Sequence, residues 1–512
     1  MRHVIVVGAG FGGLATAIRL AAHGYRVTVF EALDRPGGRA GALTLGPYRF
    51  DTGPTLLTLP SLLDALCRLA GTRLQDELEL VRLSPYYRIL FGDGRAFEYW
   101  GDPERDEEEI ARFDPRAVPA YRSFMRATQR IYKRAFGELA AQPFDRLGTF
   151  LGVLPELLRL EAHRSVYRFV SRYFHDPYLR MVFSFHPLFI GGNPLRASAI
   201  YSIVPYLERL EGVYFARGGM QAVVGLLVRL LERLGSSVRF GTPVRELVVS
   251  DRRVTGVVLD DGERVVGDAV IVNGDVATTV TELLPASARP RWLVHWIARA
   301  RYSMSCYILY GGFSRRFEQL RHHTIVMPSD YESHIRELFD GDGTLSELAF
   351  YLHAPTRTDP DFAPPGHESL YVLVPVPHLG RGGDWSPGAR DRFRERVLHT
   401  LEYLHGLDGL TGALETWSEW TPLDFRDRLR SYHGAAFSFE PTLLQSAYFR
   451  PHNRSGIPGL YFVGAGTHPG AGIPGVLLSA AVTAQAVLED VPLAHARTMH
   501  VPHTAASERR LP

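Results

Sequence analysis

The chain has 512 residues, of which 46% are hydrophobic and 22% are charged, and its 57 basic residues nearly balance its 55 acidic ones. These values are those of a folded protein of two or three domains, and they exclude a disordered chain and a polytopic membrane protein. A net charge of +2 gives no basis for nucleic-acid binding.

The first predicted unit is a βαβ unit near the N-terminus. A buried strand (His3–Val7) leads into a glycine turn and an apolar helix, and a second strand (Arg26–Phe30) follows. Because the first strand begins so early, a cleavable leader could not be removed without cutting the fold. We therefore expect no signal peptide and a protein made and kept in the cytoplasm.

The turn after the first strand has the spacing of a dinucleotide site. Gly8, Gly10 and Gly13 form GxGxxG, which permits a tight turn, close approach of a pyrophosphate to the backbone, and close helix–strand packing. Glu31 follows the second strand, where a carboxylate can accept hydrogen bonds from a ribose diol. An acid in place of a basic residue argues against a 2′-phosphate, hence against NADP at this site.

Two further glycine-containing turns follow. Taken alone, DRPGGRAGAL (34–43) is a surface turn, but it resembles the second flavin motif of the amine-oxidase-like flavoproteins. In that family its glycines approach the cofactor and its arginine faces phosphate, and FDTGPTLL (50–57) carries backbone towards the flavin. The resemblance implies FAD rather than NAD, with these added cofactor-binding residues: Arg35, Gly38, Arg39, Thr52, Gly53 and Pro54.

Residues 102–206 have long helical patterns in which arginines separate apolar residues. Two interpretations stay open: ordinary core-facing helices, or a region that lies in a membrane interface with arginine stems reaching the head groups. Within it, the run 181–194 is aromatic and carries His186 but no formal charge. His186 is either a hydrogen-bonded core residue or part of the wall of a tunnel for a long hydrocarbon.

After residue 206 the pattern returns to alternating helices and strands. A glycine pair opens a helix of about fifteen residues, and a strand follows near 238–240. If the family pattern holds, Val244 contacts adenine through its backbone. The strand within 267–276 ends in Asn273-Gly274-Asp275, where Asp275 is as well suited to cap a helix as to act in catalysis.

Residues 285–445 alternate aromatic strand-like runs with helices, which predicts a mixed sheet and a substrate domain. The last twenty or so residues have no periodicity and are expected to be disordered. Between them lies a charge-free run, 455–488, long enough in principle to cross a bilayer. Proline destabilises a helix interior by about 3 kcal/mol and glycine by nearly 1 kcal/mol, so its many glycines and prolines argue against a span. We predict a buried strand, a glycine loop and a helix from near Pro474 to Val487, forming a cofactor surface.

Along nearly its whole length the chain resembles the bacterial phytoene desaturases, the carotenoid-pathway flavoproteins. The most specific matching segments are SFHPLFIGGNP, YLHAP, PVPHLG, YHGAAFSFEPTLLQSAYFRPHNR and VGAGTHPGAGIPGVLLSA. The resemblance implies FAD bound by a discontinuous domain, peripheral attachment to the cytoplasmic side of the cell membrane, and stepwise desaturation of phytoene towards neurosporene or lycopene. The number of steps, the acceptor (quinone or oxygen) and the oligomeric state stay open.

The predicted fold is α/β, with a Rossmann-like FAD-binding domain in three parts (1–101, 207–284 and 446–492). A helical, membrane-associated insert (102–206), a mixed-sheet substrate domain (285–445) and a tail (493–512) complete the chain. By resemblance, the remaining cofactor-binding residues are Asn273, Asp275, Gly464, Ala465, Gly472, Ile473, Pro474, Gly475 and Val476. By residue type alone, His186, Asp275 and His468 are candidates to accept a proton, although a carbocation-like centre beside the flavin does not demand a strong base.

Several alternatives stay open. An amine oxidase often keeps a lysine near its flavin, but the only lysine here, Lys133, falls in the helical insert. A carotenoid isomerase, a desaturase of another carotenoid, and a non-catalytic FAD-containing carotenoid carrier are closer alternatives. Cys67 and Cys306 lie far apart with no CxxC pattern, so we expect buried thiols and no metal site.

Overall fold

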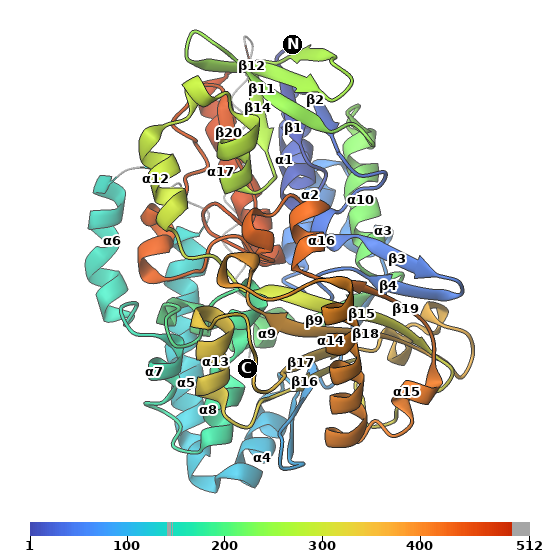
Figure 1. Cartoon of the computed structure of the whole chain (residues 1–512). Helices are drawn as coiled ribbons and strands as arrows, with labels where there is room; N and C mark the ends of the chain where they lie inside the picture. The colour runs from blue at the N-terminus through green and yellow to red at the C-terminus, as the bar shows by residue number, and fades with distance from the viewer. Residues whose placement is uncertain (141–144, 146, 494–512) are drawn as a thin grey trace.

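The computed structural model describes residues 1–140, 145 and 147–493, so the predicted tail lies outside the described residues except for Leu493 (Figure 1). A five-stranded parallel sheet forms the upper part of the molecule in that view. Its strands, in spatial order, are β10 (Ser237–Arg239), β2 (Arg26–Phe30), β1 (His3–Val7), β14 (Ala269–Val272) and β20 (Leu460–Phe462). Chain segments more than 400 residues apart therefore meet in one sheet.

Both faces of this sheet are covered by apolar layers. On one face, helices α1 (Phe11–Ala22), α10 (Gly219–Arg233) and α17 (Ile473–Asp490) share a single buried cluster. The other face packs against an antiparallel sheet made of β11 (Val244–Ser250), β12 (Arg253–Leu259) and β13 (Arg264–Val266). Parallel strands buried on both faces are expected to be continuously apolar, as β14 is throughout and β1 is after His3.

A second, mixed sheet of seven strands confirms the predicted mixed-sheet unit. Only the contact between β7 and β16 is parallel; the other neighbouring strands are antiparallel. In spatial order the strands are β19 (Leu414–Trp420), β15 (Ser305–Phe313), β18 (Glu368–Val376), β17 (Phe350–His353), β16 (His323–Val326), β7 (Tyr87–Leu90) and β8 (Ala96–Tyr99). The apolar cluster against this sheet also takes in residues from most of the helices within 103–211.

One predicted boundary differs from the structure. Residues 1–101 were expected to belong wholly to the first unit, but β7 and β8 are strands of the second sheet. The reason is a non-local one: β7 pairs with β16, more than 230 residues later, through register Thr324 to Arg88. No local pattern specifies such a partner.

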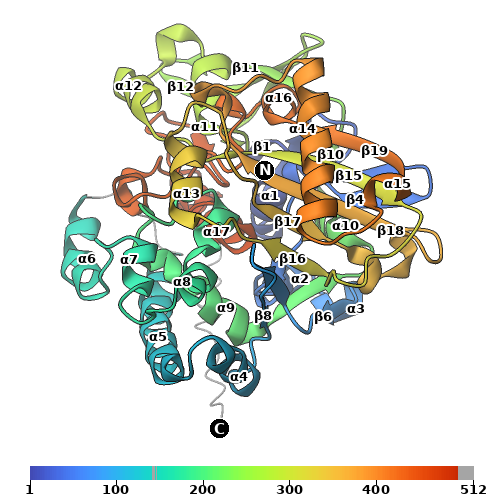
Figure 2. The same cartoon turned by 60° about the horizontal axis from the view of Figure 1, so that its bottom comes forward.

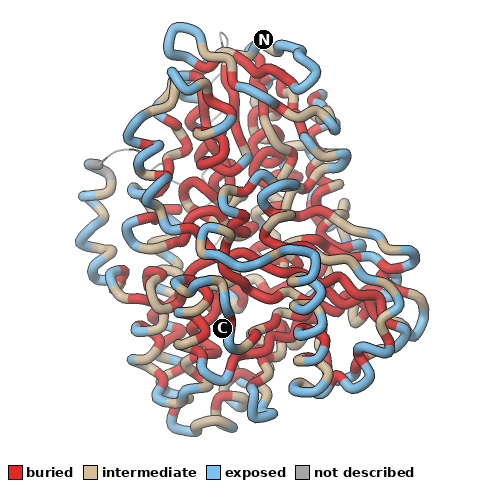
Figure 3. The backbone as a smooth tube through the Cα atoms, in the orientation of Figure 1, coloured by how far each residue is buried: buried red, intermediate tan, exposed pale blue. Residues whose placement is uncertain are grey.

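The segment 102–206 is largely helical, as predicted. Figure 2 shows its helices gathered on one side of the second sheet, and they are α4 (Pro103–Phe113), α5 (Val118–Ile131), α6 (Leu147–Arg159), α7 (Val166–Val170), α8 (Pro177–Ser184) and α9 (Val204–Glu211). Most pack on the core, whereas α6 stands at the edge of the molecule with much of its surface exposed (Figure 3).

The charge-free run near the C-terminus folds as strand, glycine loop and helix. Among the described helices, α17 alone is long and apolar enough to pass for a membrane span by length and composition. Half of that helix is buried inside the protein, and it packs along α1. The helix begins at Ile473, next to the predicted Pro474, and ends at Asp490 rather than Val487.

Candidate active site

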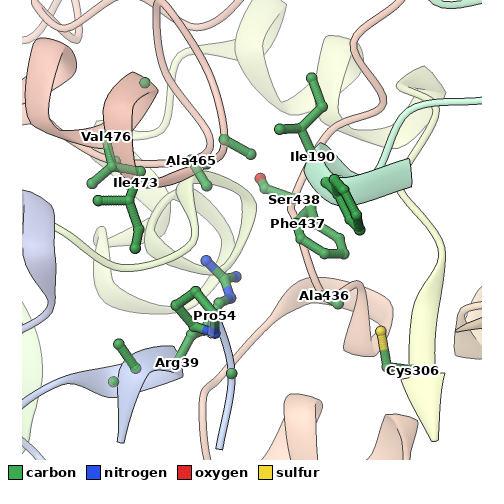
Figure 4. A pocket seen from close by; sticks show the side chains of 18 of the residues that line it. Arg39, Pro54, Ile190, Cys306, Ala436, Phe437, Ser438, Ala465, Ile473 and Val476 are labelled. Carbon is green, nitrogen blue, oxygen red and sulfur yellow. The ribbon is translucent and has the colours of Figure 1, made fainter. Parts of the chain in front are cut away.

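One cavity of about 570 Å³ joins the glycine turns of the first unit to an apolar space between the second sheet and the helical segment. Figure 4 shows Arg39, Pro54 and Ile473 across this space from Ile190 and Phe437. Its walls come from segments far apart in the sequence. Such a large concave space with a few convergent polar groups is the expected form of a cofactor and substrate site.

Nearly every predicted cofactor residue lines this cavity. The lining set is Gly8, Gly10, Glu31, Gly38, Arg39, Thr52, Gly53, Pro54, Val244, Asn273, Asp275, Gly464, Ala465, Gly472, Ile473, Pro474, Gly475 and Val476. Gly13 does not line it; a Cβ there would overlap the carbonyl oxygen of Gly8, so its role is helix–strand packing. Arg35 does not line it either, because its half-exposed side chain pairs with Asp34 at 3.0 Å.

Two helix N-termini face the cavity. Gly8 has a φ of +98°, which places the turn after β1 in a conformation that favours glycine, and α1 starts with no side-chain cap. Gly472, with a φ of +90°, precedes α17, which also lacks a side-chain cap. Uncapped helix N-termini present free amides and a partial positive charge, so both ends can hold phosphate or another electron-rich group.

Glu31 organises the first glycine turn. One carboxylate oxygen accepts a hydrogen bond from the amide of Ala9 at 2.6 Å, and the other accepts one from the amide of Leu33 at 2.9 Å. Each carboxylate oxygen has a further lone pair, and Glu31 lines the cavity. The side chain can therefore fix the turn and still accept from the hydroxyls of a ribose.

Unpartnered polar atoms mark the centre of the cavity as a place for a ligand. Arg39 is half-buried and donates from Nη2 to Ser431 Oγ at 3.1 Å. Burial lowers the pKa of its guanidinium, and the nearby Asp275 carboxylate opposes that shift. Within the described part of the chain, Arg39 Nε and Thr52 Oγ1 are buried without a hydrogen-bond partner. Buried polar groups are almost always satisfied, so an anionic, hydrogen-bonding cofactor such as FAD fits these residues.

A fully buried arginine that the sequence did not single out holds the C-terminal loop. Arg450 donates from Nη2 to the carbonyl oxygens of Ala465 at 2.6 Å and Phe439 at 3.3 Å, and from Nη1 to that of Gln445 at 3.1 Å. Ala465 lines the cavity. Arg450 therefore ties the glycine loop before α17 to the preceding segment, although nothing in its local sequence distinguishes it from a surface arginine.

The far part of the cavity is apolar. The aromatic run 181–194 supplies Phe185, Leu188, Phe189 and Ile190 to its wall, as the tunnel interpretation expects. Glu208 on α9 is a polar exception: its carboxyl is buried and accepts a hydrogen bond from Tyr87 Oη at 3.1 Å. Burial raises the pKa of Glu208 to about 8. The sequence did not reveal this residue, since it lies in an ordinary amphipathic pattern.

The three candidate proton acceptors have different positions. His186 is buried outside the cavity lining, 2.9 Å from Tyr87 Oη, and burial lowers its pKa to about 3. His468 is also buried outside this lining, and burial lowers its pKa to about 4. Asp275 lines the cavity, but Oδ1 accepts from the amides of Ala277 and Thr278, so it caps α11 (Val276–Thr278). Of these three candidates, Asp275 lines the cavity and the two histidines do not.

Comparison with known proteins places this geometry among flavoenzymes. The sequence model of the flavin containing amine oxidoreductases matches residues 11–488. The chain is 43% identical over 493 residues to a lycopene-forming phytoene desaturase of Pseudescherichia vulneris, covering 96% of this chain and 100% of the relative. It is 40% identical over 499 residues to a neurosporene-forming phytoene desaturase of Rhodobacter capsulatus, covering 96% and 95%. Wild-type putrescine oxidase bound to putrescine shares the fold, with a TM-score of 0.61 at 17% identity over 95% of this chain and 99% of that one.

Proposed function

We propose the reaction of this chain from its family membership: it belongs to the flavin-containing amine oxidoreductases and, among them, to the phytoene desaturases. It is an FAD-dependent oxidoreductase that introduces C=C bonds into phytoene in carotenoid biosynthesis. The observation that carries this function is one continuous cavity, with glycine turns and helix N-termini at one end and an apolar wall at the other. A flavin and a hydrocarbon can therefore meet without crossing solvent.

The bound FAD supplies a hydride acceptor. The chain itself must bind the substrate, align it and exclude water from it. The substrate has no polar group for recognition. Burial stabilises such a chain by about 0.8 kcal/mol per CH₂ group, so the apolar wall suffices for affinity. Alignment is the harder requirement, because a hydride moves only between atoms about 3–3.5 Å apart. The cavity is narrow between Ile190 and the Gly472 turn, because a Cβ added at Gly472 would lie only 3.2 Å from Ile190 Cγ2, and this narrowness limits how a substrate can lie there.

The substrate is taken from the cytoplasmic face of the cell membrane. Support comes from exposed leucines on α6 and on the loop beside it: Leu151, Leu158 and Leu444 are 53%, 54% and 69% exposed. The two elements touch, since the ring of Phe150 lies 5.1 Å from that of Phe449. Exposed apolar side chains grouped on a helix favour insertion into the lipid boundary. This surface is the only face we assign to lipid.

The test is anaerobic: protein with FAD, phytoene in liposomes and a quinone, followed by chromatography of the pigments. Coloured products confirm desaturation, and their absorption counts the steps towards neurosporene or lycopene. Oxygen in place of quinone then tests the alternative acceptor. Flavin that stays oxidised with phytoene recovered unchanged would instead favour a carotenoid isomerase, another carotenoid as substrate, or a carrier. Flotation with liposomes, comparing wild type with the triple variant Leu151→Ser, Leu158→Ser, Leu444→Ser, tests the membrane face; equal flotation would contradict it.

A further inference from the structure

Three buried histidines meet at the junction of β16 and β17. His323 is paired across the strands with His353, and His322 immediately precedes β16. The ring centroids lie 4.5 Å apart for His322 and His323, 4.9 Å for His322 and His353, and 5.1 Å for His323 and His353. All three side chains are almost completely buried. Nothing in the cofactor site described above uses them.

The cluster is connected to the cavity through one tyrosine. The hydroxyl of Tyr351 lies 2.8 Å from His323 Nδ1 and also forms a hydrogen bond with Thr55 Oγ1. Tyr351 and Thr55 both line the cavity, whereas none of the three histidines does. His323 is therefore hydrogen-bonded to the wall of the substrate space through the Tyr351 hydroxyl.

This hydroxyl lies at the flavin end of the substrate space. Thr55 directly follows Pro54, the last residue of the glycine turn that the family pattern places against the flavin. The Tyr351 ring is 6.2 Å from that of Phe189. The next residue, Ile190, lies near the Gly472 turn before α17, since a Cβ added at Gly472 would be 3.2 Å from its side chain. Desaturation removes a hydride from one carbon and a proton from its neighbour, so the proton acceptor must lie close to the hydride acceptor.

We propose that Tyr351 takes the proton from phytoene and that His323 accepts the hydroxyl proton of Tyr351 in the same step. This inference rests on the proposed function and adds its missing proton acceptor. The C–H bond of one carbon breaks and its electron pair forms the new C=C bond, while the neighbouring carbon gives up a hydride to FAD. A new O–H bond forms on Tyr351, and its former proton moves to His323 Nδ1.

The chemical state of His323 suits this role. Burial holds the pKa of His323 well below its usual range, so the resting ring is neutral and one nitrogen can accept. Among the described residues, its other nitrogen, Nε2, is buried without a hydrogen-bond partner. A cation on this ring is unstable, which favours onward release of the proton.

A route for release leads away from the cavity. Each of the three histidines contributes one ring nitrogen to a group whose members all lie within 4.8 Å of one another. His353 Nε2 is 3.2 Å from His322 Nε2, and His322 Nδ1 is 2.7 Å from Thr358 Oγ1. Thr358 is only half-buried, so the series ends near solvent. The proton lost by the substrate thus leaves along the cavity-facing side of the sheet, from Tyr351 towards Thr358 and away from the hydrocarbon.

The first test reads the resting protein rather than its activity. Nitrogen NMR of the holoenzyme labelled in histidine, with His323→Asn to assign the signal, reports the tautomer of His323. The relay requires an unprotonated Nδ1 that accepts from Tyr351, with the proton on Nε2. A protonated Nδ1 would overturn it. So would stoichiometric zinc or copper in the purified protein, because three imidazoles at this spacing could bind a metal and occupy the accepting lone pair.

The second test measures anaerobic flavin reduction by phytoene in Tyr351→Phe. The expected fall is about 100-fold or more, the range seen when a positioned acid–base group is lost, with FAD content and melting temperature retained. Deuterium at the proton-losing carbon should then slow the variant more than the wild type. The matched control is Tyr307→Phe on β15, which loses a buried hydroxyl bonded to Glu419 at 2.7 Å outside the cavity and should react normally.

The third variant separates proton transfer from mere positioning. His323→Asn keeps an oxygen that can accept from Tyr351 but cannot take its proton, so it should be as slow as Tyr351→Phe. Wild-type rates in either variant would overturn the relay while leaving the desaturase function intact. Failure of the wild type and of Tyr307→Phe to reduce their flavin would overturn both.

Discussion

Replacing Gly13 by alanine should separate the packing of α1 from the chemistry of the cavity. A Cβ at Gly13 would lie closer than 3.0 Å to the carbonyl oxygen of Gly8 and 3.2 Å from Asn273 Cβ. The first neighbour is a backbone atom and the second is a Cβ, so neither can move away by side-chain rotation. Helix α1, whose inner face is fully buried, would have to retreat by roughly 1 Å, and overpacking of this kind destabilises a core by about 1–3 kcal/mol.

The same displacement moves the free amides at the N-terminus of α1. Loss of one well-aligned hydrogen bond to a charged group weakens binding by about 1.5–3 kcal/mol, which corresponds to roughly 10- to 100-fold in Kd for FAD. Thermal unfolding and fluorescence titration of the apoprotein with FAD measure the two effects separately.

The control is Gly225→Ala in α10 of the same unit. An added Cβ there meets only the end of the Arg229 side chain at 3.5 Å. Alanine in a helix interior is favoured over glycine by about 0.5–1 kcal/mol, so this variant should be slightly more stable and bind FAD normally. Wild-type affinity in Gly13→Ala would show that the contact between α1 and the Gly8 turn does not set the position of the amides.

Three further outcomes are expected. Glu31→Gln replaces the charged acceptor of the Ala9 amide and should weaken FAD binding about 10- to 100-fold in the same titration, with little change in the melting temperature of the apoprotein. Arg450→Met leaves three carbonyl oxygens without their donor, two of them in fully buried hydrogen bonds, so it should lower unfolding stability by about 3 kcal/mol and release FAD, both seen by calorimetry. A wild-type melting curve would contradict this role. Burial raises the pKa of Glu208 from 4.5 to about 8, so between these values the folded state holds a proton that the unfolded state has released, and stability falls as pH rises. Glu208→Gln does not titrate, so its melting temperature should rise relative to that of the wild type between pH 5 and pH 8.5. A difference in melting temperature that stays constant over this range would exclude the shifted pKa.

The parts of this fold that the sequence reveals are those specified by neighbouring residues. The unit β1–α1–β2 follows from an apolar run, a glycine turn and helical spacing, and the strand–loop–helix around Pro474 follows from glycine and proline chemistry. The cofactor residues were assigned largely by resemblance, and the cavity collects nearly all of them. Arg35 differs because an adjacent aspartate pairs with it at the surface.

Residues that act through distant partners could not be found in the same way. The membership of β7 in the second sheet depends on pairing with β16, and the link from Tyr351 to His323 depends on the register of two strands. Glu208 has the sequence context of an exposed helix position, yet the fold encloses it. In each case the property arises from what packs against the residue, and the local sequence does not encode that neighbour.

The five-stranded sheet also has a consequence for synthesis of the protein. Helix α1 ends at Ala22, whereas β20 begins at Leu460, so roughly 440 residues must be translated before the last strand and α17 can cover α1. At about 5–20 residues per second this takes roughly 20–90 s on the ribosome. During that interval the apolar face of α1 lacks its partner, and the nucleotide turn lacks the second helix end. FAD should therefore bind only after the chain is released. Cells short of flavin should accumulate a complete polypeptide that lacks FAD and is prone to proteolysis.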